Sequence, residues 1–193
     1  MSRRFRQFSA AIILGLASLT AYGGGPTIVY YDIVGNTERD LRRELDNKGP
    51  VDDGPGGVKF DGHTRWYVNW SYRYRPVRNG CMLTGVEVTT SGVITLPRWN
   101  GAGNSDRLSN AWQQYMESLR LHEDGHYANG VMAAQEIDRL GQSFRARSCE
   151  NISVDFDRRA AEIIEKYRAA DVAYDRETDH GRTQGARFPL GGS

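Results

Sequence analysis

Two histidines interrupt the apolar stripe of a long predicted helix, which begins at Ser105 or Ser109 and runs to about Phe144. Apart from a gap between Leu119 and Gly130, apolar or small residues recur here in steps of three or four, at Leu108, Trp112, Tyr115, Leu119, Gly130, Ala133, Ile137 and Leu140. This period places them on one buried face of a helix. The same steps reach His122 and His126, so both imidazoles are expected on that face, next to each other.

The five residues around these histidines read His122-Glu123-Asp124-Gly125-His126, the H-E-x-x-H pattern. Residues four apart on a helix face the same way, so two imidazole nitrogens can reach one Zn²⁺ at about 2.0–2.1 Å. Glu123 is offset by one residue and points beside the metal, where it can take a proton from an attacking water. The pattern therefore predicts Zn²⁺ as cofactor, His122 and His126 as ligands, and Glu123 as general base.

Two glycines in the same helix add to this prediction. Each costs about 1 kcal/mol inside a helix, so Gly125 and Gly130 suggest that other groups approach the backbone closely there. The alternative is a plain helix with two satisfied core histidines.

A catalytic zinc site needs a third protein ligand. Met132 stands where a metzincin has its third histidine, which excludes that class. His180 is the preferred candidate, because it lies in a polar turn after the last predicted helix. Asp175 then orients an imidazole or is itself the ligand. Four glutamates also remain possible by position, namely Glu150, Glu162, Glu165 and Glu177.

Further residues are assigned by chemistry alone. Tyr174 or Tyr127 could donate a hydrogen bond to the oxyanion of an amide under attack. We assign Tyr174 to the catalytic set, and interpret His63 as structural or exposed.

Residues 1–23 are expected to be a signal peptide. Three arginines precede an apolar run from Ala10 to Ala21, which is too short to span a membrane. Cleavage near Ala21 or Gly23 would release a periplasmic or secreted protein without a membrane anchor. In an oxidising compartment, Cys81 and Cys149 are expected to form a disulfide.

Residues 24–193 are expected to form one zinc-metallopeptidase-like domain of the α+β class, with a small antiparallel sheet packed against the long helix and a C-terminal helix. The sheet is predicted from a strand at 27–34, an alternating strand at 63–74, a turn at Asn79-Gly80, and strand residues 81–96 ended by Pro97. The buried phase of the alternating strand is Trp66, Val68, Trp70, Tyr72 and Tyr74. A short helix starts at Thr37, a loop covers 51–62, and the last helix follows Ser153 and runs towards Tyr174.

Charge argues against nucleic acid as a partner. The formal net charge is +1, and basic residues are scattered in the sequence rather than gathered with aromatic residues on one element. We expect a monomer that acts on a peptide or protein substrate.

Several segments together resemble one known family. They are Tyr30-Tyr31-Asp32-x-x-Gly35-x-Thr37, the strand from Trp66 to Trp70, the H-E-x-x-H helix, and Tyr174-Asp175-x-x-Thr178-x-His180-Gly181-x-x-x-Gly185-Ala186. They resemble the DUF922 family, and the likeness covers nearly all of the mature chain. It implies a secreted zinc-dependent protease, and the likeness to gluzincin-type peptidases rests on the helix motif. It also implies that the turn with His180 belongs to the site.

Two other functions remain open at this stage. One is a non-catalytic zinc-binding envelope protein, against which the presence of Glu123 argues. The other is a zinc hydrolase that cleaves cell-wall peptide or another amide.

Overall fold

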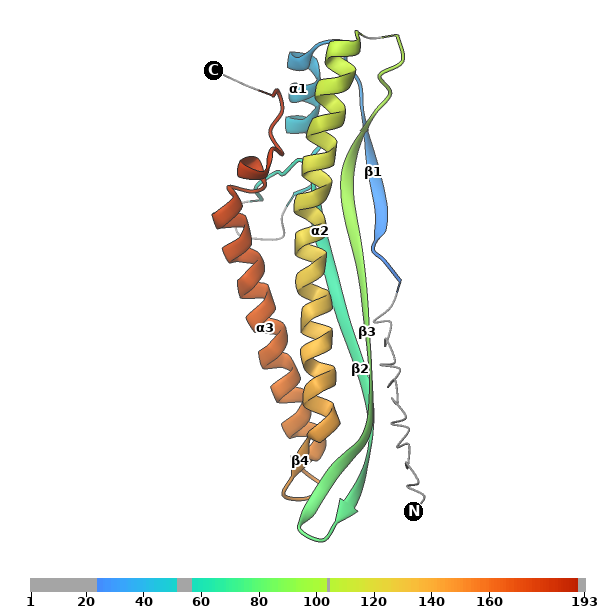
Figure 1. Ribbon diagram of the computed structural model, residues 1–193, viewed down its shortest axis with the longest axis vertical. Coiled ribbons are helices and arrows are strands. Elements are labelled where there is room, and N and C mark those ends of the chain that lie inside the picture. The colour runs from blue at the N-terminus through green and yellow to red at the C-terminus, as the bar shows by residue number, and fades with distance from the viewer. Residues whose placement is uncertain (1–23, 52–56, 104, 191–193) are drawn as a thin grey trace, which may run out of the picture.

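The computed structural model describes residues 24–51, 57–103 and 105–190. The expected signal peptide lies outside this part of the chain. The elements are β1 (Thr27–Ile33), α1 (Glu38–Lys48), β2 (His63–Val77), β3 (Gly80–Trp99), α2 (Asp106–Ser143), β4 (Arg145–Ala146), α3 (Ile152–Thr178) and a 3₁₀ turn, η1 (Arg182–Gln184). The molecule is elongated, and α2 and α3 run along one face of a narrow sheet (Figure 1). The α+β class is confirmed.

The sheet has the order β1-β3-β2, and β4 pairs with the end of β3. The predicted β2–β3 hairpin is confirmed, but it closes through the pair Val77↔Gly80, so its two-residue turn is Arg78-Asn79, one residue before the expected Asn79-Gly80. β1 runs parallel to β3. The long connection through α1 makes this parallel return possible, but nothing in the residues of β1 indicates it.

Two expectations about the strands are wrong in detail. Pro97 does not end β3, which continues to Trp99. β2 stops pairing at His63↔Thr95, so Pro97 has a strand partner only on the β1 side, and a proline without an N–H is tolerated at such a position. Tyr74 was expected in the buried phase but is 45% exposed; it follows a register shift after Arg73.

Both long helices start at or near the expected residues. Ser105 caps α2 by accepting a hydrogen bond from the Leu108 backbone N–H at 3.3 Å, and Thr37 caps α1 in the same way. α3 extends further than expected, to Thr178. Tyr174 and Asp175 therefore lie in its last turns and not in a loop after it, and this fixes the direction of their side chains.

The core consists of two apolar clusters, one towards each end of α2. One cluster packs Leu119 and the first half of α2 against α1, β1 and Phe188. The other packs Ala134 and the second half of α2 against the start of α3 and Cys81. His122 and His126 lie between these two stretches of α2.

The predicted disulfide is confirmed between Cys81 and Cys149, with Cα atoms 5.0 Å apart. It joins β3 to the loop before α3. No helix in the described part of the chain is long and apolar enough to cross a membrane.

Candidate metal centre

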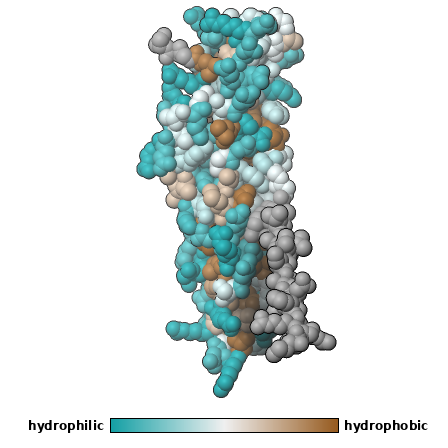
Figure 2. Space-filling model, in the orientation of Figure 1, coloured by the Kyte–Doolittle hydropathy of each residue, from teal (hydrophilic) through white to brown (hydrophobic). Residues whose placement is uncertain are grey.

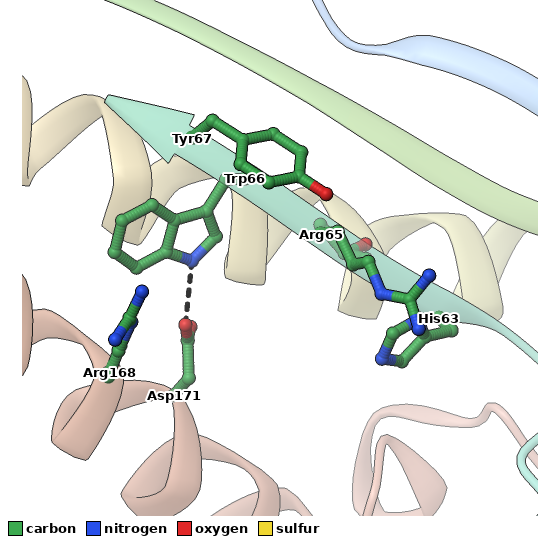
Figure 3. Close-up of a pocket in the computed structure, with 7 residues that line it drawn as sticks. His63, Arg65, Trp66, Tyr67, Arg168 and Asp171 are labelled. Atoms are coloured by element: carbon green, nitrogen blue, oxygen red, sulfur yellow. Dashed lines mark hydrogen bonds between the residues drawn. The ribbon is translucent and has the colours of Figure 1, made fainter. Parts of the chain in front are cut away.

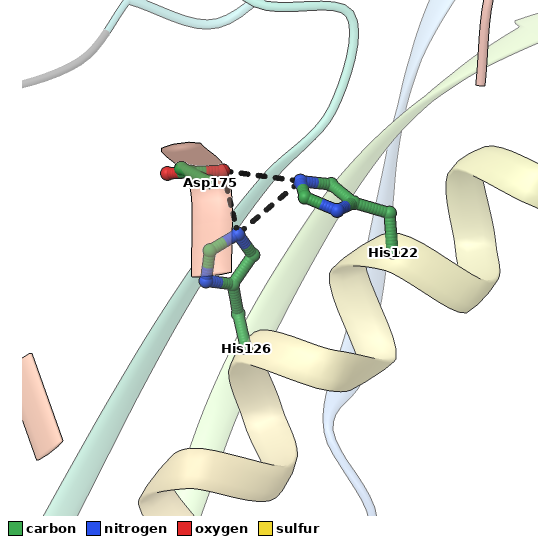
Figure 4. A group of neighbouring side chains, drawn as sticks. All are labelled: His122, His126 and Asp175. Atoms are coloured by element: carbon green, nitrogen blue, oxygen red, sulfur yellow. Dashed lines mark hydrogen bonds and ion pairs between the residues drawn. The ribbon is translucent and has the colours of Figure 1, made fainter. Parts of the chain in front are cut away.

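Three side chains from two helices converge on one point. The Nε2 atoms of His122 and His126, on α2, lie 3.3 Å apart. Each lies 3.2 Å from Oδ1 of Asp175, on α3 (Figure 4). Within the described ranges, these three residues form a group that could hold a metal ion.

The spacing of the three atoms fits a small tetrahedral ion. Ligand atoms at about 2.0–2.1 Å from a tetrahedral zinc are about 3.3–3.4 Å from one another. The three observed separations, 3.2, 3.2 and 3.3 Å, are close to that value. Two imidazole nitrogens and one carboxylate oxygen are also ligand types that zinc accepts, and three protein ligands leave one position open.

The far side of each imidazole ring is held by a hydrogen-bond acceptor. Nδ1 of His122 lies 3.0 Å from Oε1 of Gln184, and Nδ1 of His126 lies 3.1 Å from Oδ1 of Asp171. An acceptor at Nδ1 holds a proton on that nitrogen, so Nε2 is the nitrogen that can bind a metal ion once it carries no proton. Both Nε2 atoms face Asp175.

Asp171 accepts three hydrogen bonds at once. Besides His126, the amide of Asn129 donates to it at 2.7 Å, and the indole N–H of Trp66 donates at 2.7 Å. These contacts join α2, α3 and β2 around a single carboxylate. Asp171 is therefore well placed to fix the orientation of His126.

The close packing of His126 and Asp175 with other charged groups shifts the pKa values of both side chains. Burial alone lowers the pKa of His126, but hydrogen bonds to Asp171 and Asp175 outweigh it and raise the pKa to about 10. Burial raises the pKa of Asp175, but hydrogen bonds to His122 and His126 hold it well below its usual range. The group thus favours a positive charge at its centre.

Glu123 lies beside the three residues and is only 3% exposed. Its Oε2 accepts a hydrogen bond from the hydroxyl of Thr64, on β2, at 2.7 Å. Gly62 leaves room for the carboxylate, since a Cβ there would lie 2.6 Å from Oε1. Burial raises the pKa of Glu123, while the Thr64 hydrogen bond partly opposes this.

The expected close approach to two helix glycines is confirmed. A Cβ on Gly125 would lie 2.4 Å from the hydroxyl of Tyr174, and one on Gly130 would lie 2.7 Å from the ring of Trp66. Tyr174 stacks on the His122 ring, with centroids 5.1 Å apart and 13° between the planes. In this structure the glycines let a tyrosine and a tryptophan pack directly on the metal-site helix.

The two candidate oxyanion donors lie in different places. The hydroxyl of Tyr174 accepts a hydrogen bond from Nε2 of Gln184 at 2.9 Å, close to both histidine rings. Tyr127 instead packs on Gly92 of β3, and its hydroxyl donates to the carbonyl of Gly24. A catalytic role for Tyr174 stays a prediction, and Tyr127 is directed to the sheet.

His180 lies next to the group but does not belong to it. Its Nδ1 is 3.4 Å from Oδ1 of Asp175, its side chain is 51% exposed, and its ring contacts Phe60. Asp179 and His180 both have positive φ, which turns the chain away at the end of α3. The four glutamates that were open as third ligands are all exposed and outside the group: Glu150, Glu162, Glu165 and Glu177.

Sequence reasoning missed Asp171, Gln184 and Thr64. Asp171 had a usable signal, because it precedes Asp175 by four residues and so shares its helix face. Gln184 and Thr64 lie outside the helices, and nothing in their spacing marks them.

A surface cavity of about 440 Å³ adjoins the metal site, between β2 and α3 (Figure 3). Two of its lining residues also contact the site, since Thr64 donates to Glu123 and Asp171 lies against His126. His63, interpreted above as structural or exposed, lines this cavity. The complete lining is His63, Thr64, Arg65, Trp66, Tyr67, Arg168 and Asp171.

Fold and site together define a disulfide-linked α+β protein with a candidate metal centre of two histidines and an aspartate. The chain matches the DUF922 family, described as bacterial proteins of unknown function, over residues 28–181, and it belongs to that family. No curated protein and no solved structure matches it.

Proposed function

We propose that this protein is a zinc-dependent peptidase, secreted or periplasmic, with His122, His126 and Asp175 as ligands and Glu123 as general base. The observation that carries the proposal is the convergence of three zinc-type ligand atoms at 3.2–3.3 Å beside a buried glutamate. A purely structural zinc site is usually closed by four protein ligands. Three ligands and an adjacent carboxylate are what hydrolysis requires.

Zinc, when bound, supplies a Lewis acid that polarises a carbonyl and makes water acidic enough to lose a proton near neutral pH. The protein's own residues do the rest. Gln184 and Asp171 keep both imidazoles in the ligating tautomer. Thr64 holds the Glu123 carboxylate at a fixed place, from which it accepts the proton of the attacking water and returns it to the leaving amine.

The cavity beside the site supports a peptide as substrate. It runs along β2, which lies at the edge of the sheet, and an extended peptide can lie along such an edge. Arg65 and Arg168 give this cavity a basic lining. Cell-wall peptides and other amides share the same scissile bond, and the assay below separates them from protein.

The test combines zinc content, by elemental analysis, with hydrolysis of casein. Wild type should hold one zinc, and His126→Ala and Asp175→Ala should lose it. Glu123→Gln should keep zinc while hydrolysis falls by at least about 100-fold. His180→Ala should keep zinc. Glu162→Gln, which alters an exposed glutamate paired with Arg158, is the matched control and should behave as wild type.

If the wild-type protein holds no zinc, the proposal is refuted. Full casein hydrolysis by Glu123→Gln would show that Glu123 is not the general base. Zinc without casein hydrolysis would favour the non-catalytic zinc protein, unless cell-wall peptide is cleaved in a parallel assay.

A further inference from the structure

Five arginines from two separate stretches of the sequence, 73–78 and 145–147, lie at the hairpin end of the molecule. Met82 of β3 pairs with Arg75 of β2 on one side and with Arg145 of β4 on the other. Residues paired across neighbouring strands share a face of the sheet, so Arg75 and Arg145 point the same way. Arg73 precedes Arg75 by two on β2, across the register shift, and is also exposed. With Arg78 in the turn and Arg147 after β4, they form what we name the arginine tip: Arg73, Arg75, Arg78, Arg145 and Arg147.

The fold holds the arginine tip in place and turns it outwards. Cys81 and Ala146 pair next to Met82 and Arg145, so their side chains point to the opposite, core-facing side. Cys81 is fully buried and bonded to Cys149. All five arginines are exposed, and Figure 2 shows hydrophilic side chains projecting from this lower end.

The arginine tip lacks compensating charge. Within the ranges that the structure describes, none of its five side chains has a carboxylate at ion-pair distance. At the opposite end, by contrast, Arg42 pairs with Asp61 and Arg43 pairs with Asp40. Like charges on adjacent strands repel each other. An anion from outside would relieve this repulsion.

The geometry points to the arginine tip as a docking surface for an anionic phospholipid membrane. Guanidinium groups bind phosphate oxygens in pairs, and basic clusters bind anionic bilayers.

The shape of the basic surface also favours a membrane over a nucleic acid. A nucleic acid is expected to follow a basic stripe or groove. Beyond the tip, the exposed positions of β3 are Glu87, Thr89, Ser91 and, at the far end, Arg98, whose charge is paired with Asp32, so the uncompensated basic surface of this strand lies at the hairpin end. A compact basic end suits a flat anionic surface. Docked in this way, the elongated molecule would hold its metal centre away from the bilayer (Figure 1).

The test is sedimentation with vesicles of mixed phosphatidylglycerol and phosphatidylcholine, against vesicles of phosphatidylcholine alone. Wild type should bind the anionic vesicles, and added salt should weaken binding. The triple variant Arg73→Gln, Arg75→Gln and Arg145→Gln should bind roughly 100-fold more weakly, because each arginine near an anionic surface contributes about five-fold. Wild type and variants all carry the same N-terminal residues, so any vesicle binding through the apolar run 10–21 is the same in each of them.

The matched control removes the same charge from the opposite end, with Arg39→Gln, Arg43→Gln and Arg107→Gln. It should bind vesicles as wild type does. Both triple variants should unfold at the wild-type temperature, which shows that the fold is intact. The proposal would be overturned if wild type bound neutral and anionic vesicles equally. It would also be overturned if both triple variants lost binding to anionic vesicles to the same extent. Binding to a DNA duplex without binding to vesicles would overturn it too, and would assign the tip to nucleic acid.

Discussion

Asp171 is the residue whose removal tests the orientation of the metal ligands most directly. Groups that accept a hydrogen bond from a ligating histidine commonly contribute 10–100-fold to metal affinity. We therefore expect Asp171→Ala to raise the zinc dissociation constant by about 10–100-fold, measured by competition with a chromophoric chelator. Asp157→Ala is the matched control, because Asp157 accepts from the indole of Trp70 as Asp171 does from that of Trp66. Equal affinities in both variants would show that Asp171 does not orient His126.

Gly125 gives a second prediction at the same scale. Alanine normally stabilises a helix interior by about 1 kcal/mol relative to glycine. Here its Cβ would lie 2.4 Å from the Tyr174 hydroxyl, so Gly125→Ala should destabilise the protein by about 1–3 kcal/mol in urea unfolding. In a Tyr174→Ala background the same change should become neutral or stabilising. A stabilising effect in the wild-type background would show that the contact is loose.

The residue scale also shows why the site was only partly predictable. His122, Glu123 and His126 are local on one helix, so their spacing alone places them together. The choice between Asp175 and His180 depends on where α3 ends. Its four extra residues after Tyr174 place Asp175 beside His122 and His126, whereas His180 follows the end of α3 and stays half-exposed beside Asp175.

At the scale of elements, the disulfide joins the hairpin end of the sheet to the start of α3. It closes a loop of 68 residues, for which the chain-entropy relation gives about 4 kcal/mol. The double variant Cys81→Ser and Cys149→Ser should lose roughly that much in chemical unfolding, and reduced wild type should match it. Zinc content should not change, because the bridge lies beyond the second core cluster. A loss below about 1 kcal/mol would mean that the reduced chain keeps this region folded.

Most elements were predictable because their signals are local. Caps at Thr37 and Ser105, the alternation in β2 and the Asn79-Gly80 turn signal all act over a few residues. The parallel pairing of β1 and the continuation of β3 through Pro97 depend on which strands lie alongside, and no local pattern reveals that. The arginine tip has the same origin, because pairing between β2, β3 and β4 gathers residues that the sequence separates.

At the scale of the whole molecule, the candidate metal centre joins residues of α2 and α3 between the two core clusters, and a bound ion would link the two helices. An ion that binds the folded state alone stabilises it by about 2.7 kcal/mol at a concentration 100 times its dissociation constant. For a protein of this size that corresponds to a rise of about 5–10 °C in the unfolding temperature. We expect zinc to raise the unfolding temperature of chelator-treated wild type by that amount, measured by calorimetry.

Two variants separate this linkage from non-specific binding of zinc. Asp175 follows His126 by 49 residues, so the three ligands come together only when α2 and α3 are packed. In Asp175→Ala the two histidines remain four residues apart on α2, and any zinc they hold no longer connects the helices. The zinc-induced rise should therefore disappear in Asp175→Ala and persist in Glu123→Gln, whose ligands are intact. An equal rise in both variants would place the stabilising zinc elsewhere, and α2 and α3 would then be held together by their apolar packing and by the hydrogen bonds of Asp171 and Glu136.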